Sequence, residues 1–188
     1  MNGLKRIIAA IFDFLQGIVV VLAILVMIYL FIMSPQEVNG SSMEPNFHNG
    51  EYILTNKIEY KFREPQRGDV IIFKSWSDKN VDYIKRVIGL PGDTIALKDN
   101  AMYVNGEKLD ENYLASDVII FGGSFLQEGQ TVTVPPDMYF VCGDNRPHSS
   151  DSREFGPVAK DDIIGTVIFR YWPLSQLGTL THPIYNIN

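Results

Sequence analysis

The chain opens with one long apolar run and then changes to short alternating segments. From Phe14 to Met33, twenty residues carry no charge. At about 1.5 Å per residue, a helix of that length spans about 30 Å, which matches the hydrocarbon core of a bilayer. The pattern predicts a transmembrane anchor over residues 11–33, preceded by a short N-terminal segment over residues 1–10.

Two other interpretations of this apolar run are weaker. A cleaved secretory signal has a shorter apolar centre and a small-x-small cleavage site, which the end of this run, Leu30 to Pro35, does not offer. A core helix of a soluble domain normally shows a polar face, which the run lacks. An uncleaved anchor is therefore expected.

After Pro35 the pattern becomes one of short segments rich in β-branched and aromatic residues, separated by turn residues. No helix of convincing length is expected there. The pattern predicts a single all-β domain over residues 34–188. Its candidate strands are Glu51 to Asn56, Val70 to Lys74, Tyr83 to Gly89, Thr94 to Leu97, Ala101 to Val104, Gln130 to Val134, Tyr139 to Cys142 and Ile164 to Tyr171.

Turn signals divide these strands. Asn105-Gly106 is the best hairpin signal, because both central residues of a type I′ turn need positive φ. Residues 110–129 read as a long irregular excursion with Gly122-Gly123-Ser124 at its tip. Arg67-Gly68-Asp69 resembles an integrin-binding tripeptide, but its position before an apolar segment predicts a turn at the start of a strand.

Charge and cysteine content restrict the function. Lys5 and Arg6 precede the anchor, so the positive-inside bias places the N-terminus in the cytoplasm and the β domain outside. Residues 34–188 hold 14 basic and 21 acidic residues, a net charge of −7 that argues against nucleic acid as a partner. Cys142 is the only cysteine. It permits no intrachain disulfide, and its apolar neighbours predict a buried strand residue.

The candidate chemistry is a serine nucleophile with a lysine base. A serine hydroxyl needs a base to remove its proton, and a lysine can act as one only when burial lowers its pKa. Ser42 follows the anchor closely, and Lys85 lies in a strand-like segment whose alternation places Tyr83 and Val87 on its face. The adjacent Arg86 is expected to reach solvent.

Three motifs resemble the successive signature boxes of bacterial type I signal peptidases. They are Ser42-Met43-x-Pro45, then Lys85-Arg86-Val87-Ile88-Gly89-Leu90-Pro91-Gly92-Asp93, then Gly143-Asp144-Asn145-Arg146-x-x-Ser149-x-Asp151-Ser152-Arg153. With the anchor and a late segment ending at Arg170, the resemblance covers most of the chain. It implies a single-anchor membrane endopeptidase, similar to the Gram-positive form, that removes signal peptides from exported preproteins.

The resemblance also implies residue roles. Ser42 would be the nucleophile and one oxyanion donor through its backbone amide, Lys85 the general base, and Ser149 the residue that orients the lysine amine. The remaining roles are a substrate pocket for small side chains at Val38, Met43 and Tyr83, and structural support from Asp144, Asp151 and Arg153, the last two as an ion pair. One departure concerns Gly40, where some members have a serine that completes the oxyanion hole, so the second donor is unassigned.

The resemblance implies further that the partners are preproteins with small residues before the cleavage site, and the lipid bilayer. No cofactor or metal is expected, because His48, His148 and His182 are too scattered in sequence for a metal site. The oligomeric state is not indicated.

Three alternatives stay open at this point. His148 adjoins Ser149 and could serve as the base in place of the lysine. The chain could be related to soluble self-cleaving Ser/Lys repressors, although the anchor and the acidic charge argue against that. It could also be a membrane-tethered β domain that binds peptides without cutting them.

Overall fold

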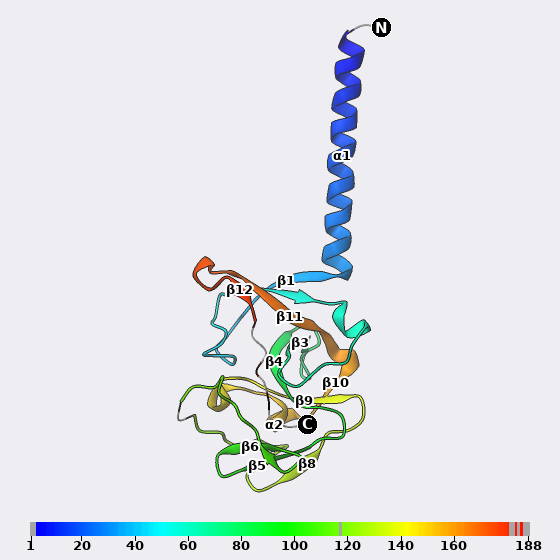
Figure 1. Ribbon diagram of the computed structural model, residues 1–188. Helices are drawn as coiled ribbons and strands as arrows, with labels where there is room; N and C mark the ends of the chain where they lie inside the picture. Colours follow the sequence, from blue (N-terminus) through cyan, green and yellow to red (C-terminus); the bar gives the residue numbers. More distant parts are fainter. Residues whose placement is uncertain (1–2, 117, 181–182, 184, 186–188) are drawn as a thin grey trace.

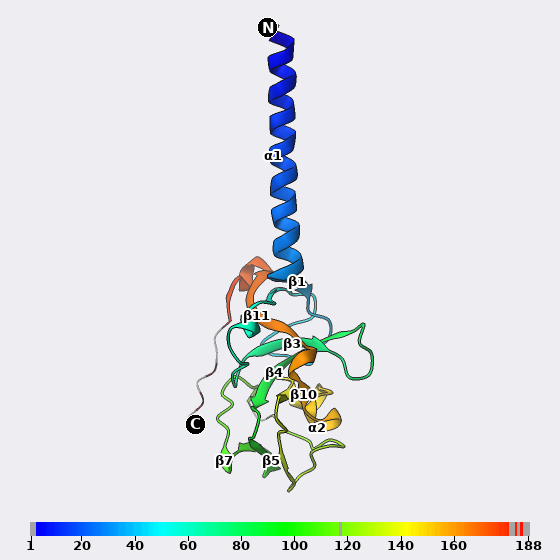
Figure 2. The ribbon, with the colours of Figure 1, turned by 90° about the vertical axis from the view of Figure 1, so that its right-hand side faces the viewer.

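One helix and one β domain make up the molecule (Figure 1). The computed structural model describes residues 3–116, 118–180, 183 and 185. Helix α1, Gly3–Phe31, projects as an isolated rod from one end of the β domain, and Figure 2 shows the same separation after a quarter turn. The all-β fold class with one N-terminal apolar helix is confirmed.

Helix α1 is long and apolar enough to cross a membrane over Lys5–Phe31, and none of that window is buried against the domain. Good helix formers extend the helix back to Gly3, so residues 3–10 are helical as well. Strand β1 begins at Met33, so the end of the predicted anchor already belongs to the β domain. Only Ile32 separates helix and strand, and its N–H still donates to Ile28 O.

The larger sheet has eight strands in the order β1-β2-β11-β3-β4-β9-β10, with β12 paired to β11. Every pairing between these strands is antiparallel. Its strands are β1 Met33–Glu37, β2 Tyr52–Asn56, β3 Val70–Lys74, β4 Asp82–Gly89, β9 Met138–Cys142, β10 Val158–Ala159, β11 Ile163–Trp172 and β12 Gly178–Thr179.

The smaller sheet has four strands in the order β7-β6-β5-β8 and lies at the end of the domain away from α1 (Figure 1). Its strands are β5 Thr94–Lys98, β6 Ala101–Val104, β7 Glu107–Lys108 and β8 Thr131–Thr133. Asn105 and Gly106 have φ of 53° and 85°, so the predicted hairpin turn between β6 and β7 is present. Cys142 is fully buried as predicted, and burial raises the pKa of its thiol to about 12.

The excursion over 110–129 does not end in a free tip. A Cβ on Gly123 would lie 2.3 Å from Arg153 O, so this glycine packs directly against the backbone of the short helix α2, Ser152–Phe155. The helical turns that remain are 3-10 turns, namely η1 Glu59–Lys61, η2 Arg146–His148, η3 Lys160–Asp162 and η4 Leu174–Gln176.

Three clusters of buried side chains form the core. One joins the smaller sheet to Phe140 and Cys142 of β9, and another lies on the opposite side of β4 around Phe73 and Tyr139. The third, between the loop after β1 and the larger sheet, contains Val38, Met43, Phe47, Ile53, Val70, Ile72 and Val167. This last cluster supports the loop that carries Ser42.

Candidate active site

The predicted serine and lysine lie together. Ser42 is in the turn-rich loop between β1 and β2, and Lys85 is in the middle of β4. Lys85 Nζ lies 2.7 Å from Ser42 Oγ and donates a second hydrogen bond to Ile84 O at 2.9 Å. Two residues that are 43 positions apart in the sequence are therefore in direct contact.

The lysine amine sits in a setting that favours its neutral form. Lys85 is only 4% exposed and has no carboxylate partner among the ion pairs of the described residues. Burial lowers the pKa of Lys85 to about 8, and the more distant Asp151 and Asp144 carboxylates only partly oppose this shift. A sizeable fraction of the amine is thus unprotonated in mildly alkaline solution.

A cleft of about 580 Å³ leads to this pair. One wall is the end of β1 with the residues after it, and the other is the loop before β4 with the first half of β4. Its lining residues are Gln36, Glu37, Val38, Asn39, Ser42, Ile53, Ile72, Asn80, Val81, Asp82, Tyr83, Ile84, Lys85 and Ser150. The buried lining residues include Val38, Ile53 and Ile72, and the exposed ones include Asn80 and Asp82.

The predicted pocket residues are divided between the cleft and the core beneath it. Val38 and Tyr83 line the cleft, and the Tyr83 ring centre lies 5.4 Å from Lys85 Nζ. Met43 is 1% exposed and belongs to the core cluster that includes Val38, so it supports the cleft from below.

Ser149 lies against the loop that carries Ser42. A Cβ on Gly143 would be 2.2 Å from Ser149 Oγ and 2.4 Å from Ser42 O, so the glycine lets these groups approach closely. Ser149 Oγ is buried, and its hydroxyl lies close enough to Asp151 to help lower the pKa of that carboxyl. A hydroxyl that donates its hydrogen still has lone pairs that can accept from another donor.

Asp151 and Arg153 form a buried ion pair, with Arg153 Nη2 2.8 Å from Asp151 Oδ2. Burial raises the pKa of the Asp151 carboxyl, but the hydrogen bonds and charge of Arg153, together with the Gly143 N–H, lower it more, and the net shift is downward. Arg153 also donates to Arg146 O and Phe121 O. The pair thereby holds together the segments around Gly143 and Phe121.

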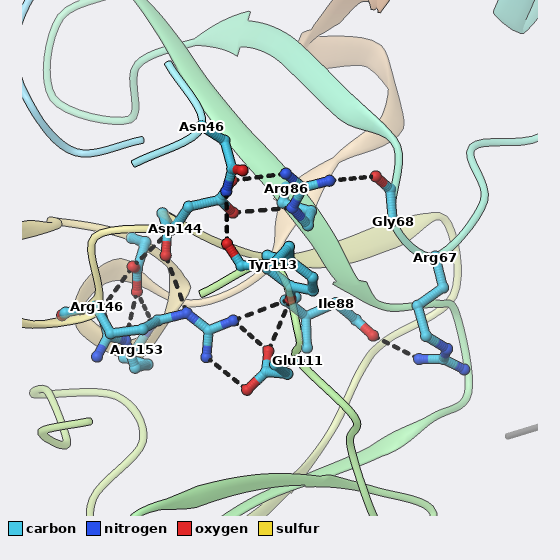
Figure 3. A network of polar contacts seen from close by, with 12 residues as sticks. Asn46, Arg67, Gly68, Arg86, Ile88, Glu111, Tyr113, Asp144, Arg146 and Arg153 are labelled. Carbon is cyan, nitrogen blue, oxygen red and sulfur yellow. Dashed lines mark hydrogen bonds and ion pairs between the residues drawn. The ribbon is translucent and has the colours of Figure 1, made fainter. Parts of the chain in front are cut away.

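The expectation that Arg86 reaches solvent is wrong. Arg86 is 4% exposed, and its Nε and Nη2 donate to the two carboxylate oxygens of Asp144 at 2.8 and 2.6 Å (Figure 3). Its guanidinium also lies 4.4 Å from the centre of the Tyr113 ring. The alternation correctly separates its face from that of Lys85, but that face is covered by segments distant in sequence.

Asn46 extends this network to the serine loop. Its Nδ2 donates to Asp144 Oδ2 and to Tyr113 O, each at 2.9 Å (Figure 3). The buried Arg146 forms an ion pair with Glu111 in the same figure. The sequence carries no signal that identifies Asn46, Glu111 or Tyr113, whereas Arg146 lies in the third motif.

His148 and Gly40 bear on the open alternatives. His148 is exposed, whereas Ser42 Oγ accepts its hydrogen bond from Lys85 Nζ. Gly40 has a φ of +94°, which an L-residue rarely adopts, and its N–H donates to Asn49 Oδ1 at 2.8 Å. The backbone conformation at position 40 therefore favours glycine over serine. No group of three or more potential metal ligands occurs among the residues that the structure describes.

Comparison with known proteins fits this geometry. The family model described as "Signal peptidase, peptidase S26" matches residues 11–172. The chain is 37% identical over 187 residues to signal peptidase IB of Staphylococcus aureus, covering 94% of both chains. It is 45% identical over 157 residues to signal peptidase I of Bacillus caldolyticus, covering 79% of this chain and 85% of that protein.

Among solved structures, signal peptidase I of Enterococcus faecalis is 35% identical, with a TM-score of 0.45, over 55% of this chain and 97% of that chain. A serine peptidase, and hence a hydrolase, is the class of protein that these relatives define. The chain belongs to the signal peptidase family, peptidase S26.

Proposed function

We propose that this protein is a membrane-anchored endopeptidase that removes signal peptides from exported preproteins with a dyad of Ser42 and Lys85. The observation that carries the proposal is the 2.7 Å contact between Ser42 Oγ and a buried lysine amine at the end of an open cleft. Burial lowers the pKa of that amine, as a lysine base requires.

The reaction follows from this contact. Neutral Lys85 takes the proton of Ser42 Oγ while the oxygen attacks the scissile carbonyl carbon, and the carbonyl oxygen becomes an oxyanion near the Ser42 N–H. When the C–N bond breaks, the leaving amine takes the proton from Lys85. Lys85 next deprotonates a water that attacks the ester, and Ser42 is released with its proton restored.

Ser149 is proposed to orient the lysine amine. Its buried hydroxyl beside Gly143 can donate toward Asp151 while its oxygen accepts a hydrogen bond from the amine as the amine turns toward Ser42. Asp144, Asp151 and Arg153 support that segment through their ion pairs. Ser149→Ala should lower kcat by roughly 10- to 10³-fold, the range expected for a misplaced base, and a variant with the parent's kcat would remove the role.

Substrate recognition is proposed to use strand edges. Strand β1 is an edge strand, and β9 pairs with β4 only from Arg86 onward, so among the described residues the segment Asp82 to Lys85 has no strand partner on that side. An extended peptide lying in the cleft could pair with these edges. Small side chains before the cleavage site would fit the shallow floor at Val38 and Tyr83, with Met43 beneath it.

The location is proposed from charge and surface. Helix α1 would anchor the enzyme, with the N-terminus in the cytoplasm by the positive-inside rule and the β domain outside. The turn after β11 lies at the end of the β domain from which α1 projects (Figure 1). Exposed apolar side chains occur in this turn, at the end of β11 and at the first residue of β2, which pairs with that end. These are Tyr52, Trp172, Leu174 and Leu177. They would contact the lipid bilayer.

A cleavage assay tests the function. The full-length protein in detergent is mixed with a purified preprotein carrying an Ala-x-Ala cleavage site, and the product's new N-terminus is sequenced. Cleavage after the final Ala, lost in Ser42→Ala, is the expected result. Binding of the preprotein without cleavage by the parent protein would favour a peptide-binding domain, and cleavage by Ser42→Ala would exclude Ser42 as the nucleophile.

A further inference from the structure

The peptide group that joins Ser41 to Ser42 is held on its carbonyl side by two donors. Ser41 O accepts a hydrogen bond from Asn145 Nδ2 at 3.0 Å and another from Glu44 N–H at 3.1 Å. The next carbonyl, Ser42 O, accepts from Asn145 N–H at 3.0 Å. Asn145 therefore binds two successive carbonyls of the serine loop, one with its side chain and one with its backbone.

The segment that carries Asn145 is firmly fixed. Gly143 approaches Ser42 O so closely that a Cβ there would lie 2.4 Å from it. Asp144, the residue between, is fully buried in its ion pair with Arg86 and accepts from Asn46 of the serine loop at 2.9 Å (Figure 3). Asn145 thus acts from a rigid base on the loop.

A peptide group is planar and trans, so its N–H points in the opposite direction from its C=O. Fixing the direction of Ser41 O therefore fixes the direction of the Ser42 N–H. Hydrogen bonds to the carbonyl also polarise the group and make its N–H a stronger donor. Within the described residues the Ser42 N–H makes no hydrogen bond of its own, so it is available to a ligand.

We infer that Asn145 is a positioning residue for the oxyanion donor, holding and polarising the peptide group whose N–H stabilises the transition state. The inference rests on the proposed function, because it requires Ser42 to be the nucleophile. Gly40 makes the Ser42 N–H more important as an oxyanion donor. Its side chain offers no hydroxyl, and its N–H is taken by Asn49 Oδ1 at 2.8 Å.

The test uses Asn145→Asp and Asn145→Ala in the full-length protein in detergent, with a peptide substrate. The aspartate keeps the shape but replaces the donor with a charge that repels Ser41 O, and the alanine removes the side chain. Loss of a whole oxyanion donor costs about 10²- to 10³-fold in rate, so a donor that is kept but misdirected should cost about 10- to 10²-fold in kcat. KM should stay within about twofold.

Two further readouts separate this role from general loosening of the loop. A peptide boronic acid forms a tetrahedral adduct with a serine, and its affinity should fall by the same factor as kcat, because the adduct needs the same donor. In Asn145→Ala the pH midpoint of kcat should not move, because that variant leaves the lysine amine untouched and adds no charge near it. Asn49→Asp is the matched control: it adds the same charge to the same loop but keeps an acceptor for Gly40 N–H, and kcat should change by less than about twofold.

Three results would overturn the inference. They are a kcat within about twofold of the parent in both variants, a loss that appears only in KM, and a loss in Asn145→Ala that is accompanied by a shifted pH midpoint. Failure of the proposed function is distinguishable, because then either the parent would not cleave at all or Ser42→Ala would still cleave. Should Asn145→Asp fail to fold, Asn145→Ala decides the matter by the same measurements, since it introduces no charge.

Discussion

The pKa values of two buried cationic side chains on opposite faces of β4 shift in opposite directions. Lys85 and Arg86 are adjacent, and each is 4% exposed. On one face the amine of Lys85 meets a serine hydroxyl and no carboxylate, and burial lowers its pKa to about 8. On the other face, burial also disfavours the charge of Arg86, but two hydrogen bonds and the charge of Asp144 outweigh it, and the pKa is raised.

The difference shows that burial by itself does not decide what a cation does. A paired guanidinium stays charged and acts as a cross-link between segments, here β4, the Asp144 turn and the ring of Tyr113. An unpaired amine gives up its proton easily and can therefore act as a base. The same strand thus carries both the proposed base and the arginine that cross-links the segments around it.

The largest expected effect comes from removing the unpaired cation. Lys85→Ala and Lys85→Arg should each lower kcat by at least about 10⁴-fold, because neither side chain can accept the serine proton; guanidinium stays protonated. Single-turnover cleavage of a peptide measures this. A Lys85→Arg enzyme within about tenfold of the parent would show that another group is the base.

Removing the paired cation should affect stability. Arg86→Met leaves the Asp144 carboxylate buried without its ion-pair partner, which should lower the free energy of unfolding by about 3 to 5 kcal/mol. Denaturant unfolding of the full-length protein in detergent measures the change. Lys79→Met is the control: its ion pair with Asp162 has a similar distance of 2.7 Å but is exposed, so the loss should be at most about 1 kcal/mol. Equal losses in the two variants would contradict the comparison.

The pH profile tests the unpaired amine directly. The proposed base Lys85 would act only when neutral, so kcat should be highest above its lowered pKa of about 8 and should fall on acidification below it. The decline should be about tenfold per pH unit, the slope of a single essential base. His148→Ala should leave the acidic limb unchanged. If the limb vanished in that variant, histidine would be the base.

The smallest effect expected is a gain in stability on replacing Lys85 with an apolar residue. The unfolded chain keeps the lysine proton up to a pKa of about 10.5, whereas the folded protein releases it at about 8. Between these values the unfolded state binds more protons, so stability rises with pH. Lys85→Met removes this penalty and should stabilise the protein below pH 8 by no more than about 3 kcal/mol.

That gain should shrink as pH rises and disappear above about 10.5, the ordinary lysine pKa. Thermal unfolding of parent and variant across this range, in the same detergent, measures the difference. A gain that is constant with pH would come from packing and would say nothing about the proton.

Much of the fold could be predicted from local pattern. The strands β2, β3, β4, β5, β6 and β9 are rich in β-branched or aromatic residues, and their predicted positions agree with the structure to within about two residues. Strand β1 was missed because Met33 to Glu37 has no apolar alternation and contains Pro35, which an edge strand tolerates. The two-residue strands β10 and β12 exist only through their partners, Tyr139 and Met138 for β10 and Phe169 and Arg170 for β12.

The candidate site could likewise be predicted only in part from local sequence pattern. Ser42 and Lys85 lie in recognisable motifs, and alternation placed Tyr83 on the lysine's face. The prediction for Arg86 was wrong because alternation indicates on which face of a strand a residue lies but not which segments pack against that face. Asp144 and Tyr113, which contact Arg86, belong to segments far from it in the sequence. The contact between Asn145 and Ser41 spans 104 residues, and a sequence pattern carries no sign of it.

The short join between α1 and β1 has a consequence for where the enzyme cuts. One residue, Ile32, lies between them. Lys57, the residue after β2, donates two hydrogen bonds to this connection, from its N–H to Ile32 O at 2.8 Å and from its amine to Tyr29 O at 3.3 Å. A connection this short, and held by these hydrogen bonds, fixes the distance between the β domain and the end of α1. With α1 in a bilayer, Ser42 would lie at a fixed distance from the membrane surface. A peptide would then be cut at a position measured from the point where it leaves the membrane.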